Sequence, residues 1–401
     1  MRNLFWAAAL AAGIAIAAPA LAENAPGVTD TEILIGQTSP YSGPASLYSA
    51  NSKVEIAYFQ MINDKGGING RKIKIISLDD GYNPAKTVEL TRKLVEQDKV
   101  AFIFSTIGTP TNVAIRKYLN QNKVPNVFVA SGGDFWGDYQ HYPWSIGLLP
   151  SYRVEANIYA KYILAHHPGA KVGLLYQNDD FGKDYLNGLR DGFGAEFDKR
   201  VIRQETYQVT DPTVDSQIVS LKGSGADVLV SGTTFKFGAQ AIRKVAELGW
   251  HPTHFISYVS SSVGGTLKPA GLDKSVGLIT AQYTKDPGDP RWKDDPGINE
   301  WRAFMTKYLP GVSQTDNNYI NGYQYAETLA QVLRQCGNDL SRENIMKQAA
   351  SINGLKLPML LPGITISTSA SDFAPIKQMQ MEKFDGNTWQ LFGEVMSGSG
   401  S

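Results

Sequence analysis

Short apolar runs alternate with amphipathic segments along most of the chain, and this pattern predicts alternating strands and helices. Residues 33–37 and 72–78 are typical of buried strands, and the segment from about 46 to 64 between them has the period of a helix. The other predicted strands are 100–104, 126–130, 172–176, 203–207, 228–231 and 254–258. The predicted helices that separate the later strands are 152–165, 185–197, 214–222 and 235–248.

Strand–helix alternation of this kind implies right-handed crossovers between parallel strands. There are too many such units for one ordinary sheet, and a chain of 401 residues is long enough for two or three domains. The predicted fold is therefore α/β, with two doubly wound parallel-sheet lobes.

The last third of the chain differs, because helices come first and strands follow. The predicted helices are 298–309, 317–336 and about 341–350. From Gly363 the pattern is β-like, and the runs 377–384 and 388–392 flank a D-G-N sequence at 385–387, which is typical of a hairpin turn. We expect these helices to cover the first lobe and the hairpin to belong to the second.

The N-terminus has the pattern of a secretory signal peptide. Arg2 is basic, residues 4–18 are apolar, and A-L-A at 20–22 fits a small-x-small cleavage site. A membrane anchor is the competing interpretation, but the alanine-rich run ends at that cleavage site. No cysteine stands at the cleavage point, which argues against a lipoprotein. We expect export, with residues 1–22 removed.

Charge and cysteine content exclude several classes of protein. Removing Arg2 with the signal peptide leaves 37 of the 38 basic side chains against 38 acidic ones, a net charge of −1. This balance does not favour nucleic acid or an acidic membrane as a partner. The single cysteine, Cys336, allows no intrachain disulfide and is expected to be a buried residue of a helix rather than a reactive thiol.

Motifs of common enzymes are absent from the sequence: we find no phosphate-binding P-loop, no G-x-G-x-x-G after a strand and no G-x-S-x-G. His251 and His254 could ligate a metal, but no third ligand is near in sequence, so surface or turn roles are expected. The acid pairs at 79–80 and 179–180 could bind a metal or act as acid and base, and we favour helix capping. No metal or cofactor is expected.

Polar loops follow four predicted strands, at the strand edge where open α/β sheets bind ligands. These loops are 39–44, 108–111, 131–133 and 232–234. Their backbone N–H groups lie at helix N-termini and suit an anion such as a carboxylate. Four aromatic residues flank the loops and are candidates for an aromatic wall. They are Tyr41, Tyr48, Trp136 and Phe181.

Several motifs resemble the type I periplasmic binding proteins of branched-chain amino acid ABC transporters. The resemblance extends from about residue 28 to 393, and N-D-K-G-G-I-N-G-R-K at 63–72 is its most specific part. The other motifs are I-G-Q at 35–37, S-G-P-A at 42–45, D-D at 79–80 and N-D-D-F-G at 178–182. The resemblance implies two lobes with a hinged cleft, three crossings between them and no catalysis.

Within that fold, we expect a first lobe of residues 27–146 plus 281–360 and a second of 147–280 plus 361–396, followed by a flexible tail at 397–401. The resemblance also implies ligand-binding positions. Tyr48 matches the family's first-loop tyrosine, and Phe181 its second-lobe aromatic residue. Gly108 and Thr109 match the carboxylate grip, where the family has serine at Gly108. The full set of candidate ligand-binding residues is Tyr41, Ser42, Tyr48, Gly108, Thr109, Ser131, Gly132, Gly133, Trp136, Phe181, Thr233 and Lys236.

Lys236 departs from the family pattern, because it matches the acid that pairs with an amino-acid ligand's amine. Thr233 or Thr234 is expected to cap the following helix, so Lys236 lies in its first turn, where a cation opposes the helix dipole. A surface lysine is the alternative. A lysine in the pocket would repel an ammonium group, so the sequence predicts an amine-free carboxylate, with an aromatic acid favoured.

The predicted function is ligand capture for an importer, by a periplasmic, monomeric solute-binding protein. Its partners are then a small carboxylate and an inner-membrane ABC permease, with no nucleic acid. An amino acid or amide ligand, a sensing domain of the same fold and a secreted α/β hydrolase are the alternatives.

Overall fold

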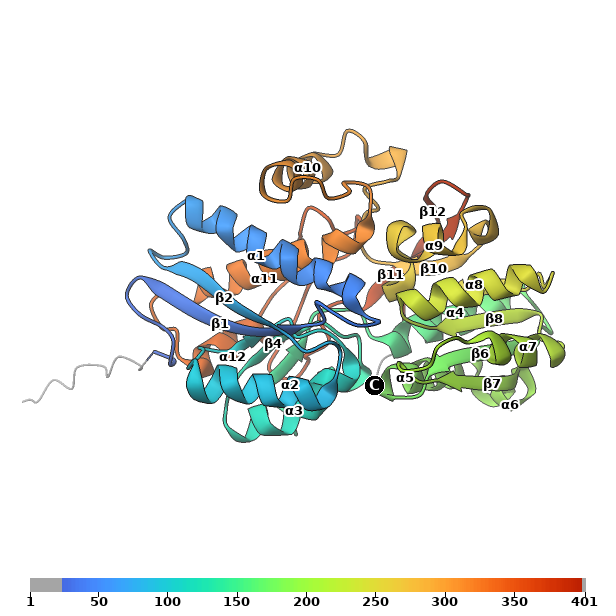
Figure 1. Ribbon diagram of the computed structural model, residues 1–401, viewed down its shortest axis with the longest axis horizontal. Helices are drawn as coiled ribbons and strands as arrows, with labels where there is room; N and C mark the ends of the chain where they lie inside the picture. Colours follow the sequence, from blue (N-terminus) through green and yellow to red (C-terminus); the bar gives the residue numbers. More distant parts are fainter. Residues whose placement is uncertain (1–23, 399–401) are drawn as a thin grey trace, which may run out of the picture.

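The computed structural model describes residues 24–398, and these form two β-sheets with helices packed against them (Figure 1). The predicted signal peptide, residues 1–22, lies outside the described residues. Within residues 24–398, no helix has the length and apolar character that crossing a membrane requires.

The first sheet has five parallel strands in the order β2-β1-β3-β4-β5. Helices α2 and α3 lie on one face, and α1 lies on the other (Figure 1). The strands are β1 (Glu32–Ser39), β2 (Lys72–Asp79), β3 (Ile103–Phe104), β4 (Asn126–Val129) and β5 (Ser145–Gly147). The helices are α1 (Ser49–Asp64), α2 (Pro84–Arg92) and α3 (Thr109–Gln121).

The second sheet has seven strands in the order β12-β11-β10-β9-β8-β6-β7. Its core is parallel, and the final hairpin adds two antiparallel strands beside β10, as the D-G-N turn predicts. The strands are β6 (Val172–Gln177), β7 (Val201–Tyr207), β8 (Val228–Gly232), β9 (Thr253–Ile256), β10 (Ile279–Gln282), β11 (Gln378–Phe384) and β12 (Trp389–Ser397). The main helices are α4 (Tyr152–His166), α5 (Asp180–Phe193), α7 (Asp215–Gly223) and α8 (Phe235–Glu247).

The chain passes between the two lobes three times. It leaves the first sheet after β5, and it leaves the second sheet after β10 to form α10 (Pro296–Tyr308), α11 (Ile320–Cys336) and α12 (Arg342–Ala349). Helices α10 and α11 pack against α1 of the first lobe (Figure 1). The chain then returns to β11 in the second sheet. The exact residues that bound each lobe stay a prediction.

Local chemistry explains where several helices begin. The Asn83 side chain accepts hydrogen bonds from the first-turn N–H groups of α2, with Pro84 at the first helical position. The Asp179 side chain accepts from Gly182 N at the start of α5. That cap starts α5 at Asp180, five residues before the predicted start.

Packing of the strands follows their apolar patterns. Leu174 and Leu175, neighbours on β6, belong to hydrophobic clusters on opposite faces of the second sheet.

Strands β5 and β10 were not predicted, because three- or four-residue runs carry too little periodicity to detect. Strand β12 extends to Ser397, the first residue of the predicted tail, and residues 399–401 lie outside the described residues.

His254 corrects the expectation of a surface or turn histidine. It lies in β9 and is buried, and its Nε2 is 2.8 Å from Ser231 Oγ. Burial lowers the pKa of His254 to about 3, so the ring stays neutral. Within residues 24–398, no cluster of three His, Cys, Asp or Glu side chains could hold a metal ion.

Cys336 is buried near the end of α11, in the position that its helical pattern predicts. Burial raises the pKa of its thiol to about 12, which keeps it in the unreactive protonated form.

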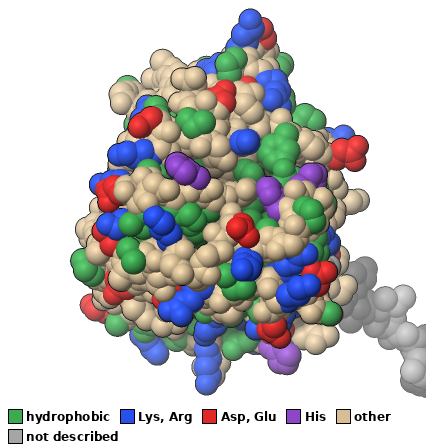
Figure 2. All heavy atoms as spheres, turned by 90° about the vertical axis from the view of Figure 1, so that its right-hand side faces the viewer, with side chains coloured by type: hydrophobic (Ala, Val, Ile, Leu, Met, Phe, Trp, Pro, Cys, Tyr) green, Lys and Arg blue, Asp and Glu red, His purple; other side chains and the backbone are tan. Residues whose placement is uncertain are grey.

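On the outer face of the second lobe, the described basic and acidic side chains are interspersed and do not form patches of one sign (Figure 2).

Candidate functional site

A pocket of about 710 Å³ of empty space, its mouth included, lies between the two lobes. Loops at the C-terminal ends of strands in both sheets contribute its walls, which is the expected ligand position in open α/β folds. The residues that line the pocket are Tyr48, Asn51, Tyr82, Ile107, Gly108, Thr109, Ala130, Leu149, Tyr152, Phe181, Thr234, Phe235, Tyr258, Val259, Ser262, Gln282, Thr284, Asn317, Asn318 and Asn321.

Two aromatic rings meet across the lobes within this pocket. Tyr48, directly before α1, stacks on Phe235, the first residue of α8, with ring centroids 4.1 Å apart and planes inclined by 14°. The Tyr48 hydroxyl also donates to the Val259 carbonyl of the second lobe at 3.0 Å. Burial raises the pKa of Tyr48 well above its usual value, so the hydroxyl remains a donor. The lobes are therefore in contact at this point of the pocket.

A second aromatic group forms the wall on the second lobe. The ring of Tyr152 packs edge-on against Phe181 at 4.7 Å and lies 5.8 Å from the ring of Tyr258. Behind them, Glu155 accepts from Tyr258 N at 2.7 Å and from the Tyr185 hydroxyl. Burial raises the pKa of Glu155 to about 8. This carboxyl group therefore orients the wall from outside the pocket.

The start of α3 forms one polar end of the pocket. Gly108 is the N-cap residue with φ of 102°, and its side-chain-free Cα leaves no capping group on the first-turn N–H groups. Such groups at a helix N-terminus attract anions. Thr109 Oγ1 lies 2.7 Å from Ser131 Oγ, which also accepts from Trp136 Nε1 at 3.0 Å. This end, which we call the anion end, can hold a carboxylate.

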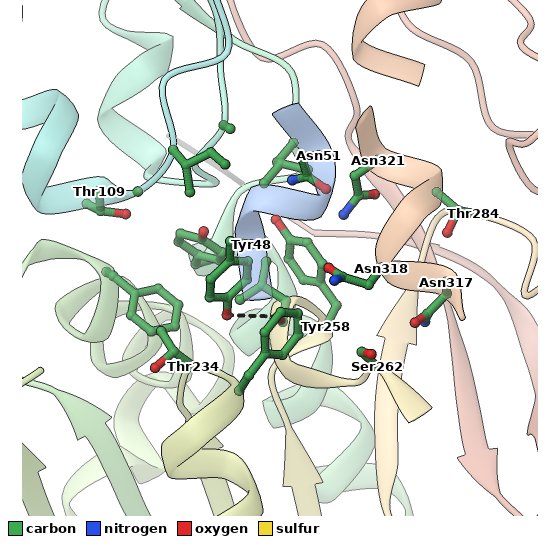
Figure 3. Close-up of a pocket in the computed structure, with 18 of the residues that line it drawn as sticks. Tyr48, Asn51, Thr109, Thr234, Tyr258, Ser262, Thr284, Asn317, Asn318 and Asn321 are labelled. Carbon is green, nitrogen blue, oxygen red and sulfur yellow. Dashed lines mark hydrogen bonds between the residues drawn. The ribbon is translucent and has the colours of Figure 1, made fainter. Parts of the chain in front are cut away.

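The opposite end carries side-chain amides, and we call it the amide end. It comprises Asn51 of α1, Gln282 of β10, Asn317 and Asn318 of the 3₁₀ turn before α11, and Asn321 in the first turn of α11. Figure 3 shows Thr109 on one side of the pocket and Asn317 and Asn321 on the other, with Tyr48 and Tyr258 between them.

Among residues 24–398, no Asp, Glu, Lys, Arg or His side chain lines this pocket. The lining that the structure describes carries only hydroxyl, amide, aromatic and aliphatic groups. A buried charge on a ligand therefore has to be held by backbone N–H groups or neutral dipoles. The anion end offers such groups to a carboxylate, whereas the lining offers no carboxylate to a cation.

Four of the twelve residues predicted from the sequence line the pocket: Tyr48, Gly108, Thr109 and Phe181. Four others lie directly behind it. Ser131 supports Thr109, and Trp136 bonds to Ser131. A Cβ on Gly132 would lie 2.6 Å from the Tyr258 hydroxyl, and one on Gly133 would lie 2.9 Å from the Phe135 ring. These glycines allow the close packing behind the lining.

The remaining four predicted residues do not reach the pocket. The Tyr41 hydroxyl lies 2.7 Å from Ser77 Oγ, and Ser42 Oγ donates to Asp79 at 2.7 Å, so both are held beside the β1–β2 edge. Thr233 is buried, and the N-cap of α8 is its neighbour Thr234, which makes no side-chain capping bond.

Lys236 points away from the pocket, contrary to its expected role. Its Nζ donates to the Asp211 carbonyl at 2.9 Å and lies 4.7 Å from the centre of the Phe237 ring. Successive residues of a helix point about 100° apart. Because Phe235 turns into the pocket at the start of α8, the next residue faces the loop around Asp211.

No residue of the amide end was predicted from the sequence as a ligand-binding residue. Its members come from positions 51, 282 and 317–321, and only the crossings between the lobes bring them together. The one local signal is the N-N-Y-I-N run at 317–321, where Asn318 and Asn321 share a helix face.

The chain is similar to known proteins over most of its length. Residues 32–388 match the family model described as periplasmic binding protein. The Leu/Ile/Val-binding protein homolog 1 of Brucella abortus (strain 2308) is 24% identical over 352 residues, which cover 85% of this chain and 86% of the relative.

Solved structures share the fold. A branched chain amino acid ABC transporter protein from Thermus thermophilus with bound valine has a TM-score of 0.83 at 17% identity, covering 93% of this chain and 98% of that one. A solute binding protein from Rhodopseudomonas palustris BisB5 in complex with 3,4-dihydroxy benzoic acid has a TM-score of 0.76 at 19% identity, covering 92% and 98%. Together with the two lobes, three crossings and interlobe pocket, these matches show that the chain belongs to the periplasmic binding protein family, in its type I, branched-chain amino acid-binding-like form.

Proposed function

We propose that this protein is the substrate-binding subunit of an ABC importer and captures a small aromatic carboxylate without an amine. It acts in the periplasm as a monomer, passes its ligand to an inner-membrane permease and catalyses no reaction. The observation that carries the ligand class is the absence of any charged side chain from the pocket lining within residues 24–398.

The argument concerns the amine. Removing an ammonium group from water costs several kcal/mol unless a counter-charge and hydrogen bonds replace the lost solvation. An α-amino acid would bring such a group into a lining without a carboxylate. A carboxylate alone can bind the N–H groups and positive dipole end of α3. The neutral lining therefore supports an amine-free acid. Lys236 gives this class no support, because its side chain points away from the pocket.

The aromatic part rests on the rings of the pocket. Tyr48, Phe235, Tyr152, Phe181 and Tyr258 present faces and edges to the cavity from both lobes. Ring–ring contacts add about 0.5–1.5 kcal/mol beyond area burial. The dihydroxybenzoate bound to the neighbour from Rhodopseudomonas palustris is compatible with this class, whereas the valine of the Thermus thermophilus neighbour favours an amino acid.

The test compares 3-phenylpropanoate with phenylalanine by isothermal titration calorimetry, since the two differ by the α-amine. We expect 3-phenylpropanoate to bind at least about a hundredfold tighter, as a difference of several kcal/mol requires. Benzoate and benzamide form a second pair that tests the carboxylate, and benzamide should bind more weakly. Mass spectrometry should recover the bound acid unchanged. Equal or tighter binding of phenylalanine or leucine would overturn the proposal.

A further inference from the structure

We propose that the amide end recognises hydroxyl groups on the ring of the bound acid, remote from its carboxylate. The ligand class is then a hydroxylated aromatic acid, oriented with its carboxylate at α3 and its hydroxyls at Asn51 and Asn317. This inference rests on the proposed function and narrows it.

Two buried acceptors at the amide end lack hydrogen-bond partners. Asn51 Oδ1 and Asn317 Oδ1 have none among the described residues, although the two residues are only 6% and 8% exposed. Both residues line the pocket. Buried polar atoms in folded proteins nearly always have a partner, so unpaired ones at a pocket indicate a ligand that supplies it. What these oxygens require is a donor.

The neighbouring amides offer donors as well as acceptors. Asn321 Oδ1 accepts from the Tyr283 hydroxyl at 2.8 Å, which leaves its NH₂ group to face the pocket. Asn318 Nδ2 donates to the Leu47 carbonyl at 3.0 Å, so its oxygen is the remaining group. The amide end therefore presents donors and acceptors side by side, and it carries no charge.

A hydroxyl group matches this set better than other ligand groups. It donates one hydrogen bond and accepts others, so it can pair with an amide oxygen and an amide N–H together. A carboxylate only accepts and would leave Asn51 Oδ1 and Asn317 Oδ1 unpaired. An ammonium group donates, but it would be buried without a counter-charge. An apolar ring edge offers no hydrogen bond and would leave the amide groups that face the pocket unpaired.

The position of Asn317 is held by bonds that link the two lobes. Asp316 Oδ1 accepts from Ser262 Oγ of the second lobe at 2.7 Å and from Asn318 N at 3.1 Å. The amide end is thus assembled where the lobes meet. A hydroxyl bound there would add to the contacts of the closed arrangement.

The experiment measures affinities within pairs of acids that differ by a ring hydroxyl. Benzoate is compared with 4-hydroxybenzoate and 3,4-dihydroxybenzoate, and 3-phenylpropanoate with 3-(4-hydroxyphenyl)propanoate, so that either spacing between carboxylate and hydroxyl is covered. We expect the hydroxylated acid to bind at least about tenfold tighter in the series that fits, as a gained hydrogen bond in a buried site implies.

Two variants assign the effect to the amide end. Asn317→Leu and Asn51→Leu keep the side-chain size and remove the polar atoms. Each should cut the preference for the hydroxylated acid over its parent acid by about tenfold, taken as the ratio of the two dissociation constants measured on the same variant. Asn353→Leu, at an exposed asparagine, is the matched control and should keep the preference.

The outcomes separate the two proposals. If parent and hydroxylated acids bind equally well to the wild-type protein, the hydroxyl site is refuted, but the aromatic-acid function stands. The hydroxyl site is refuted in the same way if the preference survives in both variants. If phenylalanine outcompetes every acid of the panel, the proposed function fails, and this inference fails with it. The wild-type comparison remains decisive even where a variant does not fold.

Discussion

Gly108 joins the backbone of α3 to the ligand pocket. Its φ of 102° lies in a region that favours glycine, and a Cβ there would lie 2.3 Å from Cε2 of Tyr82 and 2.9 Å from Thr111 Oγ1. Because Tyr82 also lines the pocket, a side chain at 108 would have to displace the wall. The glycine therefore provides both the backbone turn and the space of the anion end.

Gly108→Ala should weaken binding of the preferred acid at least tenfold, because the new methyl group moves Tyr82. Gly66→Ala is the matched control: its φ of 106° imposes similar backbone strain, but no atom lies within 4 Å of its Cβ. Both variants should lose about 1–3 kcal/mol of unfolding free energy, measured by chemical denaturation. Unchanged calorimetric affinity in Gly108→Ala would show that the carboxylate binds elsewhere.

At the scale of elements, two 3₁₀ turns and the start of helix α8 meet at the cleft. Tyr48 ends the 3₁₀ turn Ser46–Tyr48, Phe235 begins α8, and Val259 lies in the 3₁₀ turn Tyr258–Ser260. One stacking contact and one hydrogen bond join them across the lobes. Lobe closure around a ligand has to preserve or remake these contacts, so they contribute to the closed state.

Tyr48→Phe should shift the protein towards the open state, since it removes the bond to Val259 and keeps the stack. A lost hydrogen bond of about 0.5–1.5 kcal/mol corresponds to a two- to tenfold loss of ligand affinity. Without ligand, small-angle scattering should report a larger radius of gyration for the variant than for the wild-type protein. At saturating ligand, the variant should be compact.

Tyr308→Phe provides the control for Tyr48→Phe. Its hydroxyl bonds to Asp64 at 3.0 Å within the first lobe, so this variant should leave both affinity and shape unchanged. Equal behaviour of the two variants would argue that the Tyr48 bond has no part in closure.

For the whole molecule, buried glutamates make stability depend on pH. Burial raises the pKa of Glu55 in the first lobe and of Glu155 in the second to about 8, from an ordinary value of 4.5. Between these values the unfolded chain has lost both protons, whereas the folded protein keeps them. Unfolding then releases protons, so the free energy of unfolding falls as pH rises from about 4.5 to 8.

Glu155→Gln should reduce this decline, and Glu55→Gln should do the same independently, because glutamine cannot release a proton. Denaturant titrations at pH 5, 6, 7 and 8 measure the slope. Glu394→Gln changes an exposed glutamate of β12 and serves as the control. A wild-type slope that stays the same in both buried-site variants would contradict the raised pKa values.

The sequence by itself determined the fold class and much of the anion end. Strand and helix patterns arise from local burial, and caps such as Asn83 and Asp179 act within a few residues, so both are readable along the chain. The loop after β3 was predicted as a ligand site because helix N-termini and strand ends define it locally. The motif at 63–72 indicated the family without any structure.

Only the tertiary structure decided the rest of the pocket. Side-chain direction in the first turn of α8 depends on packing, and it put Phe235 rather than Lys236 into the cavity. The amide end joins Asn51 to Asn317 across more than half of the chain, because α11 packs against α1 after the second crossing. Such contacts are set by how whole elements pack, and no local pattern of residues encodes them.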